Sequence, residues 1–373
     1  MKIIIDRSAF LKPMAHIQSV VERRSNIPIL ANVLLQAKTG RLSMTATDMD
    51  MNLVNSTACI VNQPGSITVP ALTLYDIIRK LQKGSKIKLN MDKDSVNLSI
   101  SAGRSKFFLP TLQVDQFPTL PNDEITVNFM LSAANVKSLI DRTRFAISTE
   151  ETRYYLNGMY LHAIQANNIS VLRAVTTDGH RMALMEIPLP ESKSDIPPVI
   201  VPRKAIIEIR KLIDESEGWI DLAFSKNKLR FDFVDTVITT KLIDGNFPDY
   251  ERVIPSSNDK IMRLECRSLK KAVERVVTIS TAKSRSIKLE INKGNLMLSA
   301  KNLDNAWASE DMNVDYDSEP IEIGFNARYL LEITDQFNDN AIMLFHMADR
   351  ASPAIVTNEK NDGATYVIMP MRL

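Results

Sequence analysis

Hydrophobic and polar residues alternate along this chain with two periods, one typical of helices and one typical of strands. Phe10, Met14, Ile17 and Val21 recur at three- and four-residue spacing, which predicts an amphipathic helix after an opening strand. Pro13 falls within this helix, and we expect it in the first turn, where a missing N–H costs little. Two later segments with helical spacing are also expected to be helices: residues 136–140 and 269–276.

Strict alternation of apolar and polar residues predicts three hairpins. In each, two alternating runs are separated by a short polar segment, which is typical of antiparallel strands with one buried face. The predicted strand pairs are residues 87–91 with 96–100, residues 220–224 with 229–233, and residues 287–291 with 296–298.

One arrangement, a strand leading directly into an amphipathic helix, occurs three times, at Pro70, Pro202 and Gly324. These intervals are as long as a domain and far longer than solenoid repeats, so we expect three copies of one α+β domain with antiparallel sheets. Similar phrases, Gln116-Phe117-Pro118 and Asn246-Phe247-Pro248, close the first two copies. The predicted domains are residues 1–123, 124–252 and 253–373.

Composition favours a soluble protein of the reducing cytoplasm. The 373 residues are 45% hydrophobic, yet no apolar run approaches the roughly 18 residues that a membrane span needs, so we expect no membrane partner. The start of the chain does not resemble an export signal. Cys59 and Cys266 are the only cysteines and fall in different copies, so a disulfide framework and a thiolate metal site are not expected.

Several classes of enzyme chemistry have no support in the sequence. The 11 glycines are widely spaced, which excludes a phosphate-binding loop, a dinucleotide fingerprint and a nucleophile elbow. The four histidines show no spacing typical of metal ligands. We therefore expect no cofactor, no metal and no catalytic residue.

One cluster, Thr176 to Arg181, could be interpreted as acid/base machinery because it contains Asp178, His180 and Arg181. The simpler interpretation is a turn at Asp178-Gly179 followed by a strand. Adjacent strand residues face opposite sides of a sheet, whereas a catalytic pair must converge. The turn is favoured, and a hydrolase that uses Asp178 and His180 stays a minor alternative.

Basic residues recur on five of the six predicted helices, whose faces could simply be solvated. The net charge is +2, divided as +6, −2 and −2 among the three copies, so no copy has the basic excess of a protein that holds nucleic acid by charge alone. If the helices face a common cavity, the charges would form a lining that contacts phosphates and reads no bases. A monomeric nucleic-acid-binding protein is the other alternative.

Five separated motifs then add a family resemblance over essentially the whole chain. These motifs are Ile27 to Asn32, Arg153 to Gly158, Thr177 to Arg181, Phe247 to Tyr250 and Tyr366 to Leu373. In these motifs the chain resembles the sliding-clamp family, the beta subunits of bacterial DNA polymerase III.

The resemblance implies the DNA clamp fold and a non-catalytic role in replication. Each chain would have three similar domains, with sheets outside and two helices per domain facing a central channel, and two chains would form a head-to-tail homodimeric ring. The protein would be a cytoplasmic, nucleoid-associated processivity factor that encircles duplex DNA. The implied partners are double-stranded DNA, the clamp loader complex, the DNA polymerase III alpha subunit and other proteins with a clamp-binding motif.

The resemblance also assigns roles to residues of this chain. The implied partner-peptide groove consists of Leu156, Thr177, Gly179, His180, Arg181, Met182, Pro248, Arg252, Val253, Asn326, Tyr329, Val367 and Met369. The implied DNA contacts are Arg24, Tyr154, Tyr155, Arg203 and Lys204. The implied ring interface pairs Lys106, Phe107 and Leu109 with Thr278 and Ile279.

Three features depart from the family pattern. Thr278 replaces an aliphatic residue, which predicts a less apolar interface that opens more easily. Glu150 stands where the family has a neutral amide that meets DNA. The charge balance is slightly basic instead of acidic.

Overall fold

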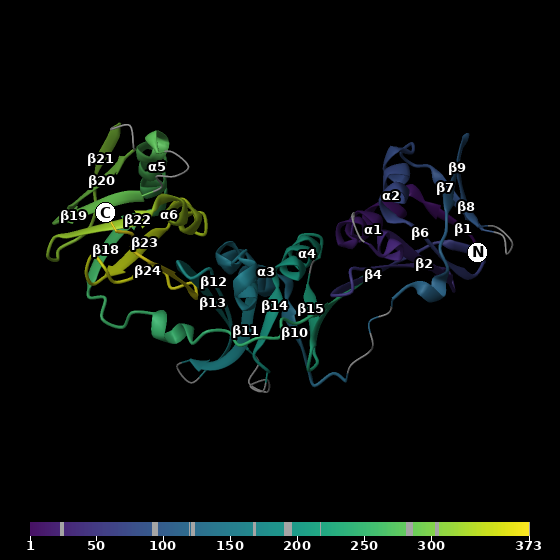
Figure 1. Cartoon of the computed structure of the whole chain (residues 1–373), viewed down its shortest axis with the longest axis horizontal. Helices are drawn as coiled ribbons and strands as arrows, with labels where there is room; N and C mark the ends of the chain where they lie inside the picture. The colour runs from purple at the N-terminus through teal and green to yellow at the C-terminus, as the bar shows by residue number, and fades with distance from the viewer. Residues whose placement is uncertain are drawn as a thin grey trace. The chain divides into compact units, whose positions relative to one another are not determined.

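The structure is a computed structural model of all 373 residues, shown in Figure 1. It describes residues 1–22, 26–91, 96–118, 120, 124–166, 169–189, 196–216, 218–280, 286–302 and 306–372. Two compact units emerge from the contacts within the chain. Unit 1 consists of Met1–Ala134 with Lys204–Leu242, and unit 2 consists of Asn135–Arg203 with Ile243–Leu373.

The predicted helices are all present, but the first, third and fifth begin a few residues before the predicted spacing at residues 10, 136 and 269. All six described α-helices directly follow a strand, three of them at the repeated strand-to-helix pattern of the sequence. The last helix, α6, is capped by the Asn326 side chain, which accepts a hydrogen bond from the Arg328 N–H. The α-helices in the described residues are α1 (Arg7–Val20), α2 (Ala71–Lys80), α3 (Ala133–Thr143), α4 (Arg203–Ile213), α5 (Cys266–Val276) and α6 (Ala327–Thr334).

Unit 1 contains two antiparallel sheets. The five-stranded sheet has the order β5 (Ile60–Gln63), β1 (Lys2–Asp6), β7 (Lys86–Asn90), β8 (Asn97–Ala102), β9 (Ser105–Pro110). The eight-stranded sheet has the order β10 (Val127–Ser132), β15 (Trp219–Phe224), β16 (Lys228–Phe233), β17 (Thr236–Lys241), β4 (Met51–Ala58), β3 (Arg41–Thr47), β2 (Asn32–Lys38), β6 (Gly65–Pro70). The second sheet therefore joins strands from the first and the second predicted domains.

Unit 2 follows the same plan. Its eight-stranded sheet has the order β14 (Val199–Pro202), β11 (Gly158–Ala166), β12 (Ile169–Thr177), β13 (Arg181–Pro188), β25 (Ala364–Ile368), β24 (Ala354–Asn358), β23 (Ile342–Met347), β18 (Lys260–Glu265). Its four-stranded sheet has the order β21 (Trp307–Asn313), β20 (Asn295–Lys301), β19 (Ser286–Asn292), β22 (Ile321–Asn326).

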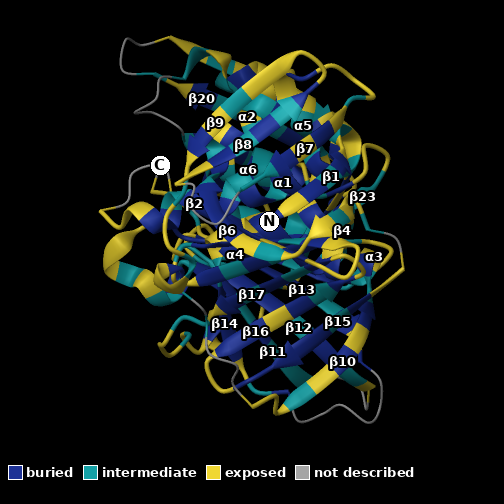
Figure 2. Ribbon diagram, turned by 90° about the vertical axis from the view of Figure 1, so that its right-hand side faces the viewer, coloured by how far each residue is buried: buried dark blue, intermediate teal, exposed yellow. Residues whose placement is uncertain are grey.

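The three predicted hairpins are confirmed as β7 with β8, β15 with β16, and β19 with β20. Burial alternates along these strands, for example along β8 and β19, so each of these strands buries one face. In Figure 2 buried residues run along strands of the large sheets, such as β12 and β13. Helix α1 packs on α2 and on β3 and β4, and α5 packs on α6. The helices thus cover the apolar faces of the sheets.

Pro13 corrects one sequence-based expectation. It lies in the middle of α1, which begins at Arg7, and not in the first turn. An interior proline removes one backbone hydrogen bond and disfavours a helix. The helix persists because Phe10, Met14 and Ile17 are fully buried, so core packing outweighs the local cost.

A polar turn of the same construction occurs in all three predicted domains. Asp48 Oδ1 accepts hydrogen bonds from the backbone N–H groups of the residues two and three positions further on, and Asp178 and Asp349 do the same. Met49 and Gly179, which follow the first two aspartates, both have a positive φ, of 79° and 88°. This shared construction supports an origin of the three copies from one domain.

A substitution of Asn55 tests how much its side chain stabilises the pairing of β4 with β17 in unit 1. Its side-chain amide donates to the Thr236 hydroxyl, and both residues are buried. Asn55→Ala would leave that hydroxyl without its partner, so we expect a loss of about 1–3 kcal/mol in the free energy of unfolding. The measurement is urea unfolding of the full chain followed by circular dichroism. Asn52→Ala, on the same strand but only partly buried, is the matched control; equal losses would contradict this role of Asn55.

Candidate functional site

All thirteen residues of the implied peptide groove lie in unit 2 and within the described residues. They come from four places: the 3₁₀ helix η4 (Glu151–Leu156), the turn between β12 and β13, the segment through the 3₁₀ helix η5 (Tyr250–Val253), and α6 with β25. We call the surface they form the docking surface. It is a meeting point of segments that are far apart in the sequence.

The apolar residues of the docking surface divide into a floor and a rim. Leu156, Met182 and Val367 are almost completely buried, at 3%, 2% and 1% exposure. Val253 and Met369 are 43% and 38% exposed. Alternation alone did not predict this division, because burial depends on which strands cover which face. Of these five residues, only Val253 and Met369 are accessible to a partner in this conformation.

Pairing of β13 with β25 holds the two halves of the docking surface together. Arg181 pairs with Ile368 and Met182 with Val367 in antiparallel register. Beyond the end of the strand, the Met369 N–H donates to the His180 carbonyl over 3.0 Å. The exposed His180 ring lies 6.4 Å from the Tyr329 ring, centroid to centroid, with the planes nearly parallel.

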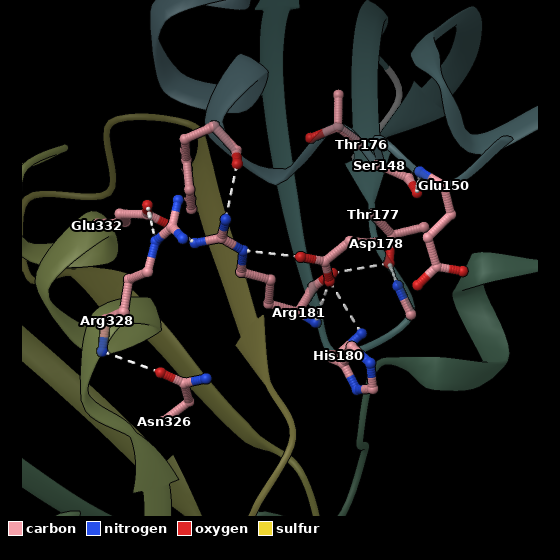
Figure 3. Close-up of polar contacts among 12 residues, drawn as sticks. Ser148, Glu150, Thr176, Thr177, Asp178, His180, Arg181, Asn326, Arg328 and Glu332 are labelled. Atoms are coloured by element: carbon pink, nitrogen blue, oxygen red, sulfur yellow. Dashed lines mark hydrogen bonds and ion pairs between the residues drawn. The ribbon is translucent and has the colours of Figure 1, made fainter. Parts of the chain in front are cut away.

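Arg181 is the most constrained side chain at the site, as Figure 3 shows. Its side chain is 6% exposed. The guanidinium lies 3.2 Å from Asp178 Oδ2, forms an ion pair with Glu332 on α6 and donates to the Phe145 carbonyl over 2.8 Å. The same group stacks over the Tyr329 ring at 4.4 Å. This network ties the turn to α6, so the docking surface is stiff on this side.

Tyr250 fixes the segment that carries Pro248, Arg252 and Val253. Its hydroxyl lies 2.9 Å from His162 Nε2 and accepts a hydrogen bond from Arg173 Nη1 over 2.7 Å. Burial lowers the pKa of His162, and the Arg173 cation adds to this shift, so the ring is neutral near pH 7. These bonds place η5 beside the floor of the docking surface, where Tyr250 packs with Met182 and Val367.

The Asp178 and His180 pair does not have the arrangement of a catalytic dyad. Asp178 Oδ1 accepts from the backbone N–H groups of His180 and Arg181, while Oδ2 faces the Arg181 guanidinium. The carboxylate therefore serves the turn. Within the described part of the chain, no group of three His, Cys, Asp or Glu side chains is gathered as metal ligands would be. No helix of that part combines the length and apolar character needed to cross a bilayer.

The implied DNA contacts are placed as follows. Tyr154 is 54% exposed, and its ring meets that of Tyr155 edge to face at 5.8 Å. Arg203 and Lys204 are both exposed at the start of α4, and Lys204 forms an ion pair with Asp48 in unit 1. Arg24 lies outside the described residues.

The implied ring-interface residues of the first domain lie on β9, an edge strand of the five-stranded sheet. Phe107 is half-buried and borders a cavity of about 800 Å³ between the end of α2 and the hairpin of β8 and β9. Leu109 is buried in its own chain at 7% exposure, whereas Phe108, which the sequence did not single out, is 67% exposed. Lys106 and Thr278 are exposed and Ile279 is half-buried, the last two in the 3₁₀ helix η6 (Val277–Ile279).

Three family profiles match the chain in order along its length. They describe the N-terminal, central and C-terminal domains of the DNA polymerase III beta subunit and match residues 1–121, 130–249 and 251–372. The chain belongs to the DNA polymerase III beta subunit family. Beta sliding clamps are its processivity factors and non-catalytic subunits, so the predicted fold and function class are confirmed.

Relatives of known identity cover the whole chain. The beta sliding clamp of Caulobacter vibrioides is 48% identical over 373 residues, all of both chains. A crystal structure of the C. crescentus clamp, with PEG bound at a region assigned to beta-motif tethering, has a TM-score of 0.98 at 48% identity and covers 100% of this chain and 99% of its own. A Bartonella birtlesii sliding clamp bound to griselimycin has a TM-score of 0.96 at 43% identity, with full coverage of both chains.

These likenesses do not test the boundaries at residues 123 and 252 or the role of any single residue of this beta clamp. Both stay predictions. The sequence reasoning also missed Arg153, Tyr250 and Glu332 at the docking surface. Arg153 and Tyr250 belong to two of the motifs that carry the family resemblance. Nothing in the sequence around Glu332 indicates its contact with Arg181.

Arg181 generates a prediction about stability. Arg181→Met would leave Asp178 without its cation and Glu332 with Arg328 alone, so we expect unit 2 to lose at most about 3–5 kcal/mol of stability. Arg252→Met is the matched control, because that side chain is 86% exposed and its ion pair with Asp249 should contribute less than about 1 kcal/mol. Thermal melting of both variants compares the two arginines; similar melting temperatures would refute a structural role of the Arg181 network.

Proposed function

We propose that this beta clamp closes into a homodimeric ring around duplex DNA and tethers replication proteins through the docking surface. The observation that carries the proposal is the full-length match to beta sliding clamps, in sequence and in fold. A sliding clamp implies DNA and a polymerase as partners. The finer assignments below rest on the residues described above.

Topological retention suits the charge of this chain. Its net charge is only +2, and Lys204, one of the five proposed DNA contacts, is paired with Asp48. Binding by phosphate contacts alone needs many unpaired cations and falls steeply with salt. A closed ring needs only weak contacts, which we assign to Arg24, Tyr154, Tyr155, Arg203 and Lys204. These contacts would position the duplex without reading its bases.

The ring interface is proposed between β9 of one chain and η6 of a second copy. The cavity beside Phe107 could receive the half-buried Ile279, with Thr278 at its edge. Lys106 is exposed on the same strand, and buried Leu109 would support the interface from below. A head-to-tail contact that closes after two chains leaves no unpaired end.

The docking surface is proposed to bind short segments of the DNA polymerase III alpha subunit, the clamp loader complex and other proteins with a clamp-binding motif. Its exposed rim contains Val253 and Met369 over a buried apolar floor. Methionine adapts its shape to different apolar anchors, which fits a surface shared by several partners. Because the proposed substrate of the ring is chromosomal DNA, the protein would act in the cytoplasm, at the nucleoid.

A circular template tests topological retention. The clamp is loaded on a nicked plasmid by its loader complex, and the plasmid is then linearised with a restriction enzyme. We expect the clamp to remain on the intact circle and to leave the linear DNA within minutes, because only free ends release a closed ring. Retention is measured by gel filtration of labelled clamp. Equal loss from both templates would argue for direct binding by a monomer.

Ile279 tests the ring interface. Ile279→Asp would place an unpaired carboxylate in the proposed contact, so we expect the dimer to weaken by at least about 100-fold. Sedimentation velocity at micromolar concentration should then show one chain's mass. Val234→Asp is the control, because Val234 is 96% exposed and lies outside the proposed interface. A dimer that survives Ile279→Asp would exclude this interface.

A further inference from the structure

Glu150 precedes η4 and forms an ion pair within unit 2. Its Oε2 lies 2.8 Å from Arg153 Nε and 2.7 Å from Arg153 Nη2, so one carboxylate oxygen accepts from both. The Glu150 backbone is also fixed, because its N–H donates to the Ser148 hydroxyl and its carbonyl accepts from the Arg153 N–H. Three residues on, Arg153 departs from helical geometry, with φ of −112° and ψ of 52°.

Arg153 in turn lies directly on the turn of the docking surface. Its Nη2 donates to the Asp178 carbonyl over 3.1 Å. Its Nη1 occupies the space beside Gly179, only 2.5 Å from where a Cβ at that position would be. The positive φ favours glycine at position 179, and a Cβ there would displace this guanidinium from its present place. Figure 3 shows Glu150 next to the same turn.

The segment that carries Arg153 also contributes to the floor of the docking surface. Leu156 ends η4, and its carbonyl accepts from the Ser148 N–H, just ahead of Glu150. Two contacts therefore hold η4 in place on either side of Glu150. One is the hydrogen bond from Ser148 to Leu156, and the other is the contact of Arg153 with the turn. A glutamine there could not hold Arg153 by charge.

We propose that Glu150 is a positioning residue for partner binding: it holds Arg153 against the turn at Asp178 and Gly179, and so fixes this side of the docking surface before a partner binds. This inference rests on the proposed docking function. Without the carboxylate, Arg153 would sample other rotamers, and the partner would have to order the side chain at its own cost. Glu150 would affect the partner only through Arg153.

The expected effect is small, because the ion pair is partly exposed. The side chains of Arg153 and Glu150 are 32% and 53% exposed. Such pairs are weak and are screened by salt, so Glu150→Gln should weaken peptide binding by about two- to fivefold at low salt and by less at high salt. A role of Glu150 in packing alone would not depend on salt in this way.

A double-mutant cycle tests the proposal. A fluorescently labelled peptide from the clamp-binding segment of the DNA polymerase III alpha subunit is titrated with the full-length clamp, and its Kd is read by anisotropy at low and high salt. The variants are Glu150→Gln, Arg153→Gln and the double substitution. Glu151→Gln is the matched control, with the same change in charge at the next, exposed position.

We expect Glu150→Gln to weaken binding, Glu151→Gln to leave it unchanged, and Glu150→Gln to add nothing once Arg153 is glutamine. Equal affinities of the Glu150 and Glu151 variants would overturn the proposal, and so would a full Glu150 effect in the Arg153→Gln background. If the unchanged clamp fails to bind the peptide, the docking function itself is wrong. Melting curves of all variants check that each is folded.

Discussion

Backbone pairing between β13 and β25 is the constraint on which the docking surface depends. β13 lies in the second predicted domain and β25 in the third, yet Met182 and Val367 are direct partners in the β-ladder. A slip of one residue would exchange the buried and exposed faces of β25. It would place Val367 at the surface and remove the bond from Met369 to His180. The floor, the rim and the position of the turn therefore follow from one register.

Unit 1 contains the same backbone arrangement without an apolar surface. There the Lys241 N–H donates to the Asp50 carbonyl, as the Met369 N–H does to His180 in unit 2. In place of Met182 paired with Val367, unit 1 pairs Asn52 with Thr239. Lys241 Nζ and Asp50 then form an ion pair at 3.1 Å. This strand pairing is thus polar in unit 1 and apolar in unit 2, which agrees with the proposed docking to unit 2.

Local pattern predicted the elements, but not the contacts between them. Periodicity located α1 and the hairpins because burial of one face repeats along each of them. It misplaced Pro13 in its helix, since only tertiary packing explains an interior proline. It also could not separate the buried Val367 from the exposed Met369, or find Glu332, which lies 151 residues from Arg181. The groove itself was expected only from the family resemblance, because such contacts leave no local trace in a single sequence.

Charge pairing connects the docking surface with the way a clamp must hold DNA. Arg153 precedes the proposed DNA contact Tyr154, and Lys204 is itself a proposed DNA contact. Arg153 forms an ion pair with Glu150, and Lys204 forms one with Asp48. A protein that depended on phosphate contacts would lose affinity through such pairs. A ring that must slide loses nothing essential, because retention does not require tight contacts. The carboxylates can therefore organise loops and turns, and the chain can use its cations to build the surface proposed to bind partners.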